Sequence, residues 1–182
     1  MDRKQLSAQL AEYSRSNPKE SLFVAQFNSL LKQSRCFFRD YFPGHITGSA
    51  WITNSNHSKV LLVHHAKLGK WLQPGGHADG DENVFEVAKK ELLEETGISH
   101  ASANRNIFDI DIHKIPEQKD IQEHFHYDIR FLFIADEFQP LRINHESHEA
   151  RWIRLSELEQ YNKEKSMIRM KQKLLHRHAI WN

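Results

Sequence analysis

The chain has 182 residues, of which 39% are hydrophobic and 27% are charged, and its formal net charge at pH 7 is +1. A chain of this length and composition can bury one substantial core, so it predicts a single globular domain. The small net charge gives no strong field that would attract nucleic acid or an acidic membrane surface, and an anionic ligand has to be held by local groups. We therefore expect no nucleic-acid partner and no membrane partner.

Cysteine content and hydropathy indicate in which cellular compartment the protein is expected. Cys36 is the single cysteine, which excludes an internal disulfide and suits a reducing environment. The first ten residues, MDRKQLSAQL, are polar, and no apolar run approaches the roughly 18 residues that a membrane-spanning helix needs. These features predict a cytoplasmic protein.

Residues 1–42 are predicted to form an N-terminal helical extension of two helices. The first has apolar residues at helical intervals, and Asn17 and Pro18 mark the start of the second. The apolar positions are Leu6, Leu10, Tyr13, Leu22, Phe23, Phe27, Leu30 and Leu31. Because large apolar faces usually find an interface, we expect the extension to pack on the domain formed by residues 43–182 or on a second copy of the chain, as in a homodimer. Recognition of a substrate or partner is the alternative.

Strands separated by turns are predicted from His45 onward. Residues 46–53 and 59–64 form an expected hairpin around Asn54, Ser55 and Asn56. The stretch from Val60 to Val63 is apolar enough for a central strand.

The segment 76–98, GHADGDENVFEVAKKELLEETGI, predicts a helix of about 13 residues between glycine-containing loops. At about 100° per residue, Glu91 and Glu95 lie about 40° apart on this helix, and Glu94 lies about 60° to the other side of Glu91. The three carboxylates repel one another unless a cation sits among them. Their hard oxygen donors favour magnesium or manganese.

The spacing of this segment resembles the Nudix box, G-x5-E-x7-R-E-U-x-E-E-x-G-U, in which U is aliphatic. The matching positions are Gly76, Glu82, Glu91, Leu92, Glu94, Glu95, Gly97 and Ile98. The resemblance implies an α/β fold, namely the Nudix α/β/α sandwich with a mixed sheet, and a Mg²⁺- or Mn²⁺-dependent phosphoanhydride hydrolase with Glu91, Glu94 and Glu95 as metal ligands. A solvated acidic helix stabilised by ion pairs is the alternative, but it does not explain the flanking glycines.

Lys90 is the one departure from the box, because the family has arginine there. In the family this arginine is understood to orient a catalytic carboxylate. A guanidinium group can do so with two parallel hydrogen bonds, whereas an ammonium group offers a point charge. We expect Lys90 to keep the catalytic role with looser positioning, at a cost of about 1 kcal/mol or more.

Two half-buried strands are predicted after the box, at residues 106–114 and 124–134, because apolar and polar residues alternate in both. His124 and His126 share one side of the second strand, and a neighbouring strand could bring His113 or Asp111 toward them. Such a cluster could bind a transition metal or ligand phosphates. The alternative is the wet face of a two-stranded ribbon.

Substrate contacts are expected from Gly76, His77 and Arg130. His77 directly follows the first glycine of the box, and we expect the box loop to approach the metal site. In the resembling family a carboxylate or histidine beyond the box often helps to activate water. Glu146, in the segment HESHEARW, is the preferred residue for that role, and Glu149 is the alternative of a structural carboxylate.

A last strand is predicted at about residues 150–154, followed by helices at 155–160 and 164–179. The basic residues of the final helix alternate with apolar ones, which favours a solvated amphipathic helix over a nucleic-acid surface.

The resemblance implies hydrolysis of a small nucleotide-type substrate, a nucleoside diphosphate linked to another moiety. Glu94 or Glu146 would accept the proton of the attacking water. Two alternatives remain. An isoprenyl diphosphate isomerase also has the Nudix fold but needs a reactive cysteine in its site, and Cys36 lies far from the box in sequence. A non-catalytic nucleotide-sensing module can lose the glutamates, and here they are present.

Overall fold

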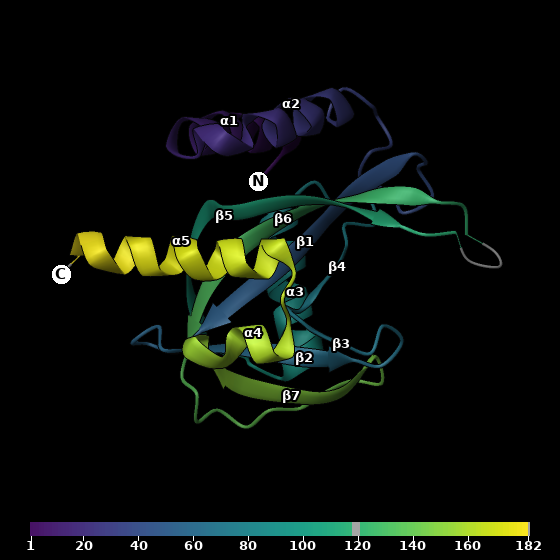
Figure 1. Ribbon diagram of the computed structural model, residues 1–182. Coiled ribbons are helices and arrows are strands. Elements are labelled where there is room, and N and C mark those ends of the chain that lie inside the picture. The colour runs from purple at the N-terminus through teal and green to yellow at the C-terminus, as the bar shows by residue number, and fades with distance from the viewer. Residues whose placement is uncertain (118–120, 182) are drawn as a thin grey trace. The chain divides into compact units, whose positions relative to one another are not determined.

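The computed structural model describes residues 1–117 and 121–181, so Asn182, the last residue of the expected domain, lies outside the described residues. Its elements are α1 (Arg3–Ser16), α2 (Ser21–Leu30), β1 (Gly44–Thr53), β2 (Lys59–His65), β3 (Lys70–Leu72), β4 (Gly75–His77), α3 (Val84–Thr96), β5 (Ala101–Ile115), β6 (His124–Ala135), β7 (Ser147–Arg154), α4 (Leu158–Tyr161) and α5 (Lys165–Trp181), shown in Figure 1. Short 3-10 helices precede α2 and α4.

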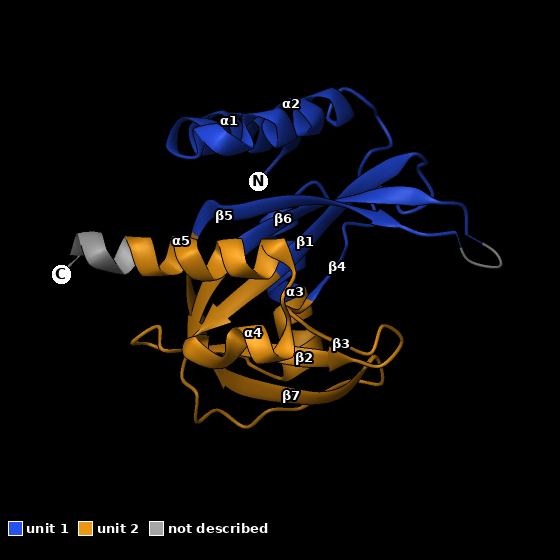
Figure 2. Ribbon diagram, in the orientation of Figure 1, with its two compact units in different colours: residues 1–49, 75–90, 105–131 blue, residues 50–74, 91–104, 132–182 orange. Residues whose placement is uncertain are grey.

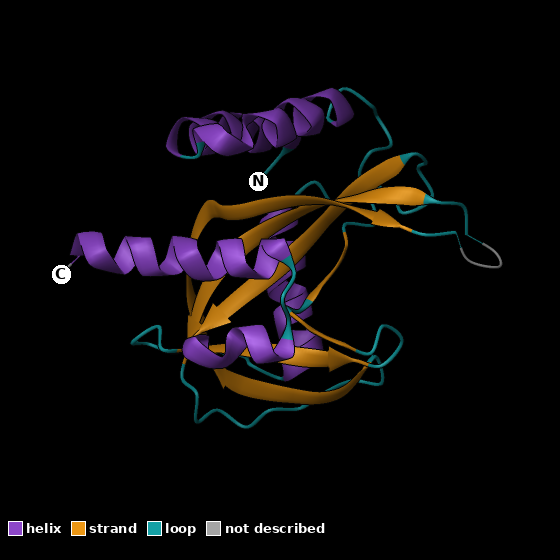
Figure 3. Cartoon of the chain, in the orientation of Figure 1, coloured by secondary structure: helices purple, strands orange, loops and turns teal. Residues whose placement is uncertain are grey.

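The fold is α/β, with a mixed sheet and N-terminal helices, as the sequence predicted (Figure 3). The strands hydrogen-bond in the order β3-β2-β1-β6-β5, while β4 also pairs with β1 and β7 with β2. The predicted hairpin is present, with Ile52 opposite Leu61 and Thr53 opposite Val60. The side-chain oxygen of Asn54 closes its turn by accepting hydrogen bonds from the backbone N–H groups of Ser58 and Lys59.

The chain divides into two compact units, coloured separately in Figure 2. Unit 1 contains residues 1–49, 75–90 and 105–131, and unit 2 contains residues 50–74, 91–104 and 132–182. Within unit 1 the ring of Phe85 meets that of Phe131 edge-on at 5.2 Å. Within unit 2 the side chain of Trp71 meets Tyr161 edge-on at 5.6 Å.

The N-terminal extension is joined to the rest of unit 1 by polar and aromatic contacts. The backbone N–H and the Nε of Arg3 donate to the carboxylate of Glu82 at 3.0 and 3.1 Å. The ring of Phe27 meets that of Tyr127 edge-on at 5.3 Å. The extension therefore packs on strand β6 and on the segment before α3, while the domain boundary between residues 42 and 43 stays a prediction.

The alternative of a wet polar face on the two long strands is wrong for the middle of that face. Asp109 on β5 is fully buried, and Asp128 and Arg130 on β6 are 2% and 3% exposed. The hydroxyl of Tyr13 on α1 donates to Asp109 at 3.4 Å. Because α1 approaches this face and the polar groups bond one another, the alternating pattern marks a buried polar layer.

Two short strands, β3 and β4, were not predicted, because three residues are too few to show an alternating pattern. β4 pairs with β1 through Thr47 opposite His77 and Gly48 opposite Gly76. No helix among the described residues combines the length and the apolar character needed to cross a membrane.

Gly48→Ala should destabilise the protein. A Cβ atom at Gly48 would lie 2.8 Å from the carbonyl oxygen of Val84 and 2.9 Å from its Cγ1, so α3 would have to shift. We expect the free energy of unfolding, measured in urea, to fall by about 1–3 kcal/mol. Ser102→Ala, at an exposed position of β5, is the control and should change stability by less than about 0.5 kcal/mol. Equal stability of the two variants would contradict the close contact.

Candidate active site and histidine cluster

Helix α3 has the length and the ends that the sequence predicted, with 13 residues from Val84 to Thr96. Before its first turn, the carboxylate of Asp81 accepts a hydrogen bond from the backbone N–H of Asn83 at 2.8 Å. After its last turn, Gly97 has a φ of +75° and donates its N–H to the carbonyl of Leu93. A residue with a side chain would be strained at this positive φ, whereas glycine adopts it readily and so provides the left-handed cap that ends the helix.

The three box glutamates lie on this helix with different exposures. Glu94 is exposed, Glu91 is half-buried, and Glu95 is 4% exposed. The apolar residues Phe85, Ala88 and Leu92 are buried, as the amphipathic pattern predicted. Their carboxylate oxygens are the hard donors that a divalent cation of the magnesium class prefers. Among the described residues, however, the three glutamates do not form a group whose ligand atoms all lie within 4.8 Å of one another.

The loop that begins the box is shaped by glycines. A Cβ atom at Gly75 would lie 2.1 Å from the side-chain oxygen of Ser49, so the close pairing of β4 with β1 requires glycine there. Gly76 follows in the same strand, opposite Gly48. Lys90, where the box usually has arginine, is exposed on α3.

Arg130, which the sequence analysis placed among the substrate contacts, is enclosed by carboxylates. Its guanidinium group donates to Asp128 at 2.6 Å, to Asp109 at 3.2 Å and to Asp111 at 3.4 Å. Burial disfavours the charge, but the three carboxylates outweigh that effect and raise the pKa of Arg130. This arrangement favours a role in joining β5 to β6 over direct contact with substrate.

Glu146 lies in the turn before β7, and its side chain is exposed. Its backbone is fixed on both sides, because its N–H donates to the side chain of Asn144 and its carbonyl accepts from the N–H of Ala66. Glu149 pairs with Arg151 at 2.5 Å on the same strand, which fits the structural alternative for that residue.

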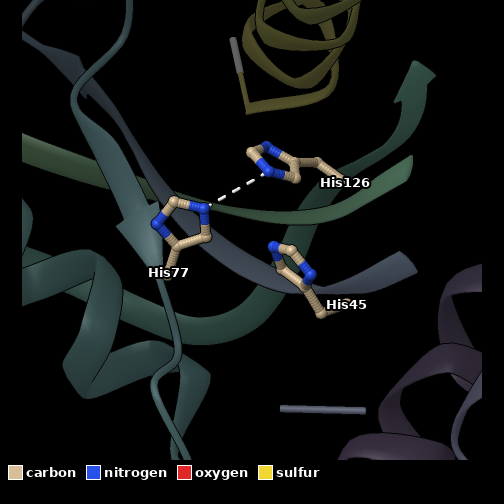
Figure 4. Close-up of side chains that lie close together, drawn as sticks. All are labelled: His45, His77 and His126. Atoms are coloured by element: carbon tan, nitrogen blue, oxygen red, sulfur yellow. Dashed lines mark hydrogen bonds between the residues drawn. The ribbon is translucent and has the colours of Figure 1, made fainter. Parts of the chain in front are cut away.

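Histidines from three strands meet in unit 1 (Figure 4). The ligand atoms of His45 on β1, His77 on β4 and His126 on β6 all lie within 4.8 Å of one another. The Nε2 atoms of His77 and His126 are 3.3 Å apart, and the Nε2 of His124 is also 3.3 Å from that of His126. His113 is at the edge of this group, with its ring 5.4 Å from that of His126.

Sequence reasoning found part of this cluster. It paired His124 with His126, but it left out His45 and gave His77 a different role. The sequence signal that could have pointed to a larger cluster was the high number of histidines, thirteen in all. The pairing of the short strand β4 with β1 could not be predicted, and this pairing brings His77 close to His45.

Burial favours the neutral form of the imidazoles of His45, His77 and His126. Desolvation lowers the pKa of His77 to about 4, with Arg39 and His45 adding to the effect. Desolvation, with smaller contributions from the neighbouring histidines, lowers the pKa of His126 to about 2. The pKa of His45 is lowered by burial as well. Neutral imidazoles are metal ligands and hydrogen-bonding groups, but they do not attract anions.

The NUDIX domain family matches residues 44–174 of the chain. The protein belongs to the NUDIX domain family. Enzymes of this family are pyrophosphohydrolases and generally use a divalent metal. The match includes the box and all the residues of the histidine cluster, and it leaves out the N-terminal helices.

Individual relatives are similar over different extents. Phosphatase NudJ of Escherichia coli is 51% identical over 43 residues, which are 22% of this chain and 28% of that protein, so the chain spans less than a third of the length of the curated relatives it matches. A Caenorhabditis elegans Ap4A hydrolase in a binary complex has a TM-score of 0.60 and 17% identity, covering 74% of this chain and 97% of that one. The NUDIX domain of Shewanella oneidensis NrtR, complexed with ADP ribose, has a TM-score of 0.53 and 18% identity, covering 76% and 94%. At these identities the two structures show the shared fold.

The stability of this NUDIX protein should fall as the pH is lowered from 7 to 5 in metal-free buffer. In the folded state the pKa values of His77 and His126 lie below the ordinary 6.5, so the unfolded state binds more protons in this range. The loss should approach about 2 kcal/mol for each histidine at pH 5. Urea unfolding at both pH values measures it.

His126→Gln should reduce this pH dependence, because it removes one of the groups that charge on unfolding. His100→Gln is the matched control, since His100 is exposed and lies outside the cluster. A wild-type stability that is the same at pH 7 and pH 5 would show that these histidines are not held neutral by burial.

Proposed function

We propose that this NUDIX protein is a metal-dependent phosphoanhydride hydrolase that cleaves the diphosphate of a nucleoside diphosphate linked to another moiety. The observation that carries the proposal is the set of Glu91, Glu94 and Glu95 on a capped helix inside the region that the family matches. The nucleotide-type substrate is supported by the solved relatives named with Ap4A and ADP ribose, both of which contain such a phosphoanhydride.

Glu91 and Glu95 hold the divalent ion in this proposal, and Mg²⁺ or Mn²⁺ fits their oxygen donors. When bound, the ion supplies positive charge to the diphosphate oxygens and makes a nearby water more acidic. Glu94 has the exposed carboxylate of the three and accepts the proton of the attacking water. Glu146 is the second candidate for that base, because its fixed backbone and exposed side chain suit proton transfer.

Other residues position these groups. The ammonium group of Lys90, next to Glu91 in the sequence, holds the catalytic carboxylate as a point charge. Gly76 allows the diphosphate to approach the backbone, with His77 beside it. Arg130 acts indirectly, by fixing the carboxylates of Asp109 and Asp128 between the two strands.

The isomerase alternative is disfavoured by the environment of Cys36. This residue is fully buried, and burial raises the pKa of its thiol, so it has little thiolate character. The sensing-module alternative is disfavoured because all three helix glutamates are retained. Incubation with ADP-ribose and Ap4A, in Mg²⁺ and then in Mn²⁺, followed by chromatography of the products, tests hydrolysis directly. Recovery of intact substrate under every condition would favour the sensor.

Glu94→Gln and Glu95→Gln should each lower kcat for diphosphate cleavage by about 100-fold or more, because a metal ligand or the base is lost. Glu86→Gln is the matched control, since Glu86 is on the same helix but pairs with Arg105. Circular dichroism should show that all three variants are folded. Full activity of a variant that carries both Glu94→Gln and Glu95→Gln would contradict the proposed mechanism.

Lys90→Arg should raise kcat by about fivefold, corresponding to about 1 kcal/mol of better positioning. Lys89→Arg, at the adjacent exposed position of α3, is the matched control and should leave kcat unchanged. If turnover of Lys90→Arg is equal to or lower than wild type, Lys90 does not replace the orienting arginine.

A further inference from the structure

We propose that His45, His77 and His126 form a second metal site, which takes a divalent transition-metal ion of the zinc type. Its ligands are imidazole nitrogens from three strands of unit 1, and the group includes none of the helix glutamates. It does not depend on the proposed hydrolysis.

The backbone holds the three ligands on rigid elements. His77 on β4 pairs with the strand β1 opposite Thr47, and His45 is two residues before Thr47. Because side chains two residues apart on a strand point to the same side, His45 and His77 share one side of this strand pair. His126 and His124 likewise share one side of β6. Ligands on paired strands are more precisely placed than ligands on loops.

Backbone carbonyls fix which ring nitrogens carry protons. The Nδ1 of His45 lies 3.3 Å from the carbonyl oxygen of Tyr41, and the Nδ1 of His124 lies 2.8 Å from that of Gln122. A carbonyl only accepts hydrogen bonds, so both Nδ1 atoms carry the hydrogen, and in the neutral ring of His45 the Nε2 presents its lone pair. Metal-binding histidines are oriented by this kind of bond.

The Nε2 of His45 is the observation that points most directly to a missing ligand. His45 is 1% exposed, and within the described part of the chain its Nε2 has no hydrogen-bond partner. A buried acceptor without a partner costs about 1–3 kcal/mol, and binding a cation removes that cost. His45 also offers a ring nitrogen within 4.8 Å of the ligand atoms of His77 and His126.

The distance between the ligand nitrogens of His77 and His126 fits two ligands of a tetrahedral ion. Zinc–nitrogen bonds of about 2.0–2.1 Å place two ligands of a tetrahedron about 3.3–3.4 Å apart. The Nε2 atoms of His77 and His126 are 3.3 Å apart, and so are those of His124 and His126. The group whose ligand atoms all lie within 4.8 Å of one another contains His45, His77 and His126 but not His124, so the strands supply three ligands and leave the fourth position of the ion open.

An anion is the less suitable occupant. Phosphate oxygens accept hydrogen bonds, and the Nε2 of a neutral His45 is an acceptor as well, because its Nδ1 carries the hydrogen that faces the carbonyl oxygen of Tyr41. Imidazole nitrogen is a borderline donor that suits zinc, copper, nickel and cobalt better than magnesium, so the donor set also separates this site from the carboxylates of α3.

Titration of the metal-free protein with Co²⁺ tests the proposal, because four-coordinate Co²⁺ with nitrogen ligands has a strong visible absorption that octahedral Co²⁺ lacks. We expect the band to saturate at one equivalent and to disappear when Zn²⁺ is added. His126→Gln and His77→Gln should each abolish the band and weaken Co²⁺ binding by about tenfold or more. Two variants are used so that a folding defect in one, seen by circular dichroism, leaves the other as the test.

Two control variants separate this site from the helix glutamates and from the surface histidines. His100→Gln should keep the band, because His100 is exposed outside the cluster. The double variant Glu94→Gln, Glu95→Gln should keep it as well, even though its hydrolase activity is lost. Absence of the band from the wild-type protein, or its persistence in both His77→Gln and His126→Gln, would overturn the metal site and leave the proposed hydrolysis unaffected.

Discussion

Gly48 on β1 contacts two parts of the box at once. It lies opposite Gly76 of β4, and the position that its Cβ would occupy is within 2.8 Å of the first turn of α3. Close approach of strand and helix at this point fixes where the box loop ends and where the helix begins. A side chain at position 48 would meet this first turn, so the pairing of β4 with β1 and the start of α3 both depend on glycine there.

Unit 1 is organised around buried charge as well as apolar packing. Arg130 and its three aspartates are joined to β1, because the carboxylate of Asp128 also accepts hydrogen bonds from the hydroxyls of Thr47 and Ser49. A buried ion cluster is stable only when every member is paired, so the strands that supply it are held in one register. The N-terminal helices belong to the same arrangement through Tyr13, and through Arg3, which bonds to Glu82 of the box. The extension is therefore packed against residues that the family motif includes.

The two proposed metal sites offer different donor atoms, so we expect them to select different metal ions. Carboxylate oxygens on α3 suit magnesium or manganese, which keep open positions for phosphate, while the imidazole nitrogens of unit 1 suit a zinc-type ion. His77 follows Gly76 directly in the sequence, so a cation held by His77 would stiffen the strand that begins the box.

The sequence by itself determined the box helix, its caps and the α/β class, because these depend on local spacing: Gly97 after the last helical residue and glutamates at fixed intervals are visible without any partner. It also predicted the β1–β2 hairpin from its turn residues. Only the tertiary structure decided what covers the alternating strands and which histidines meet. Asp109 and Arg130 have the same periodicity whether their face is wet or buried, and His45 and His77 are 32 positions apart (77 − 45). Contacts of that kind depend on the pairing of strands that are far apart in the sequence. A strand of three residues such as β4 is too short for its alternating pattern to be recognised, so its pairing cannot be predicted.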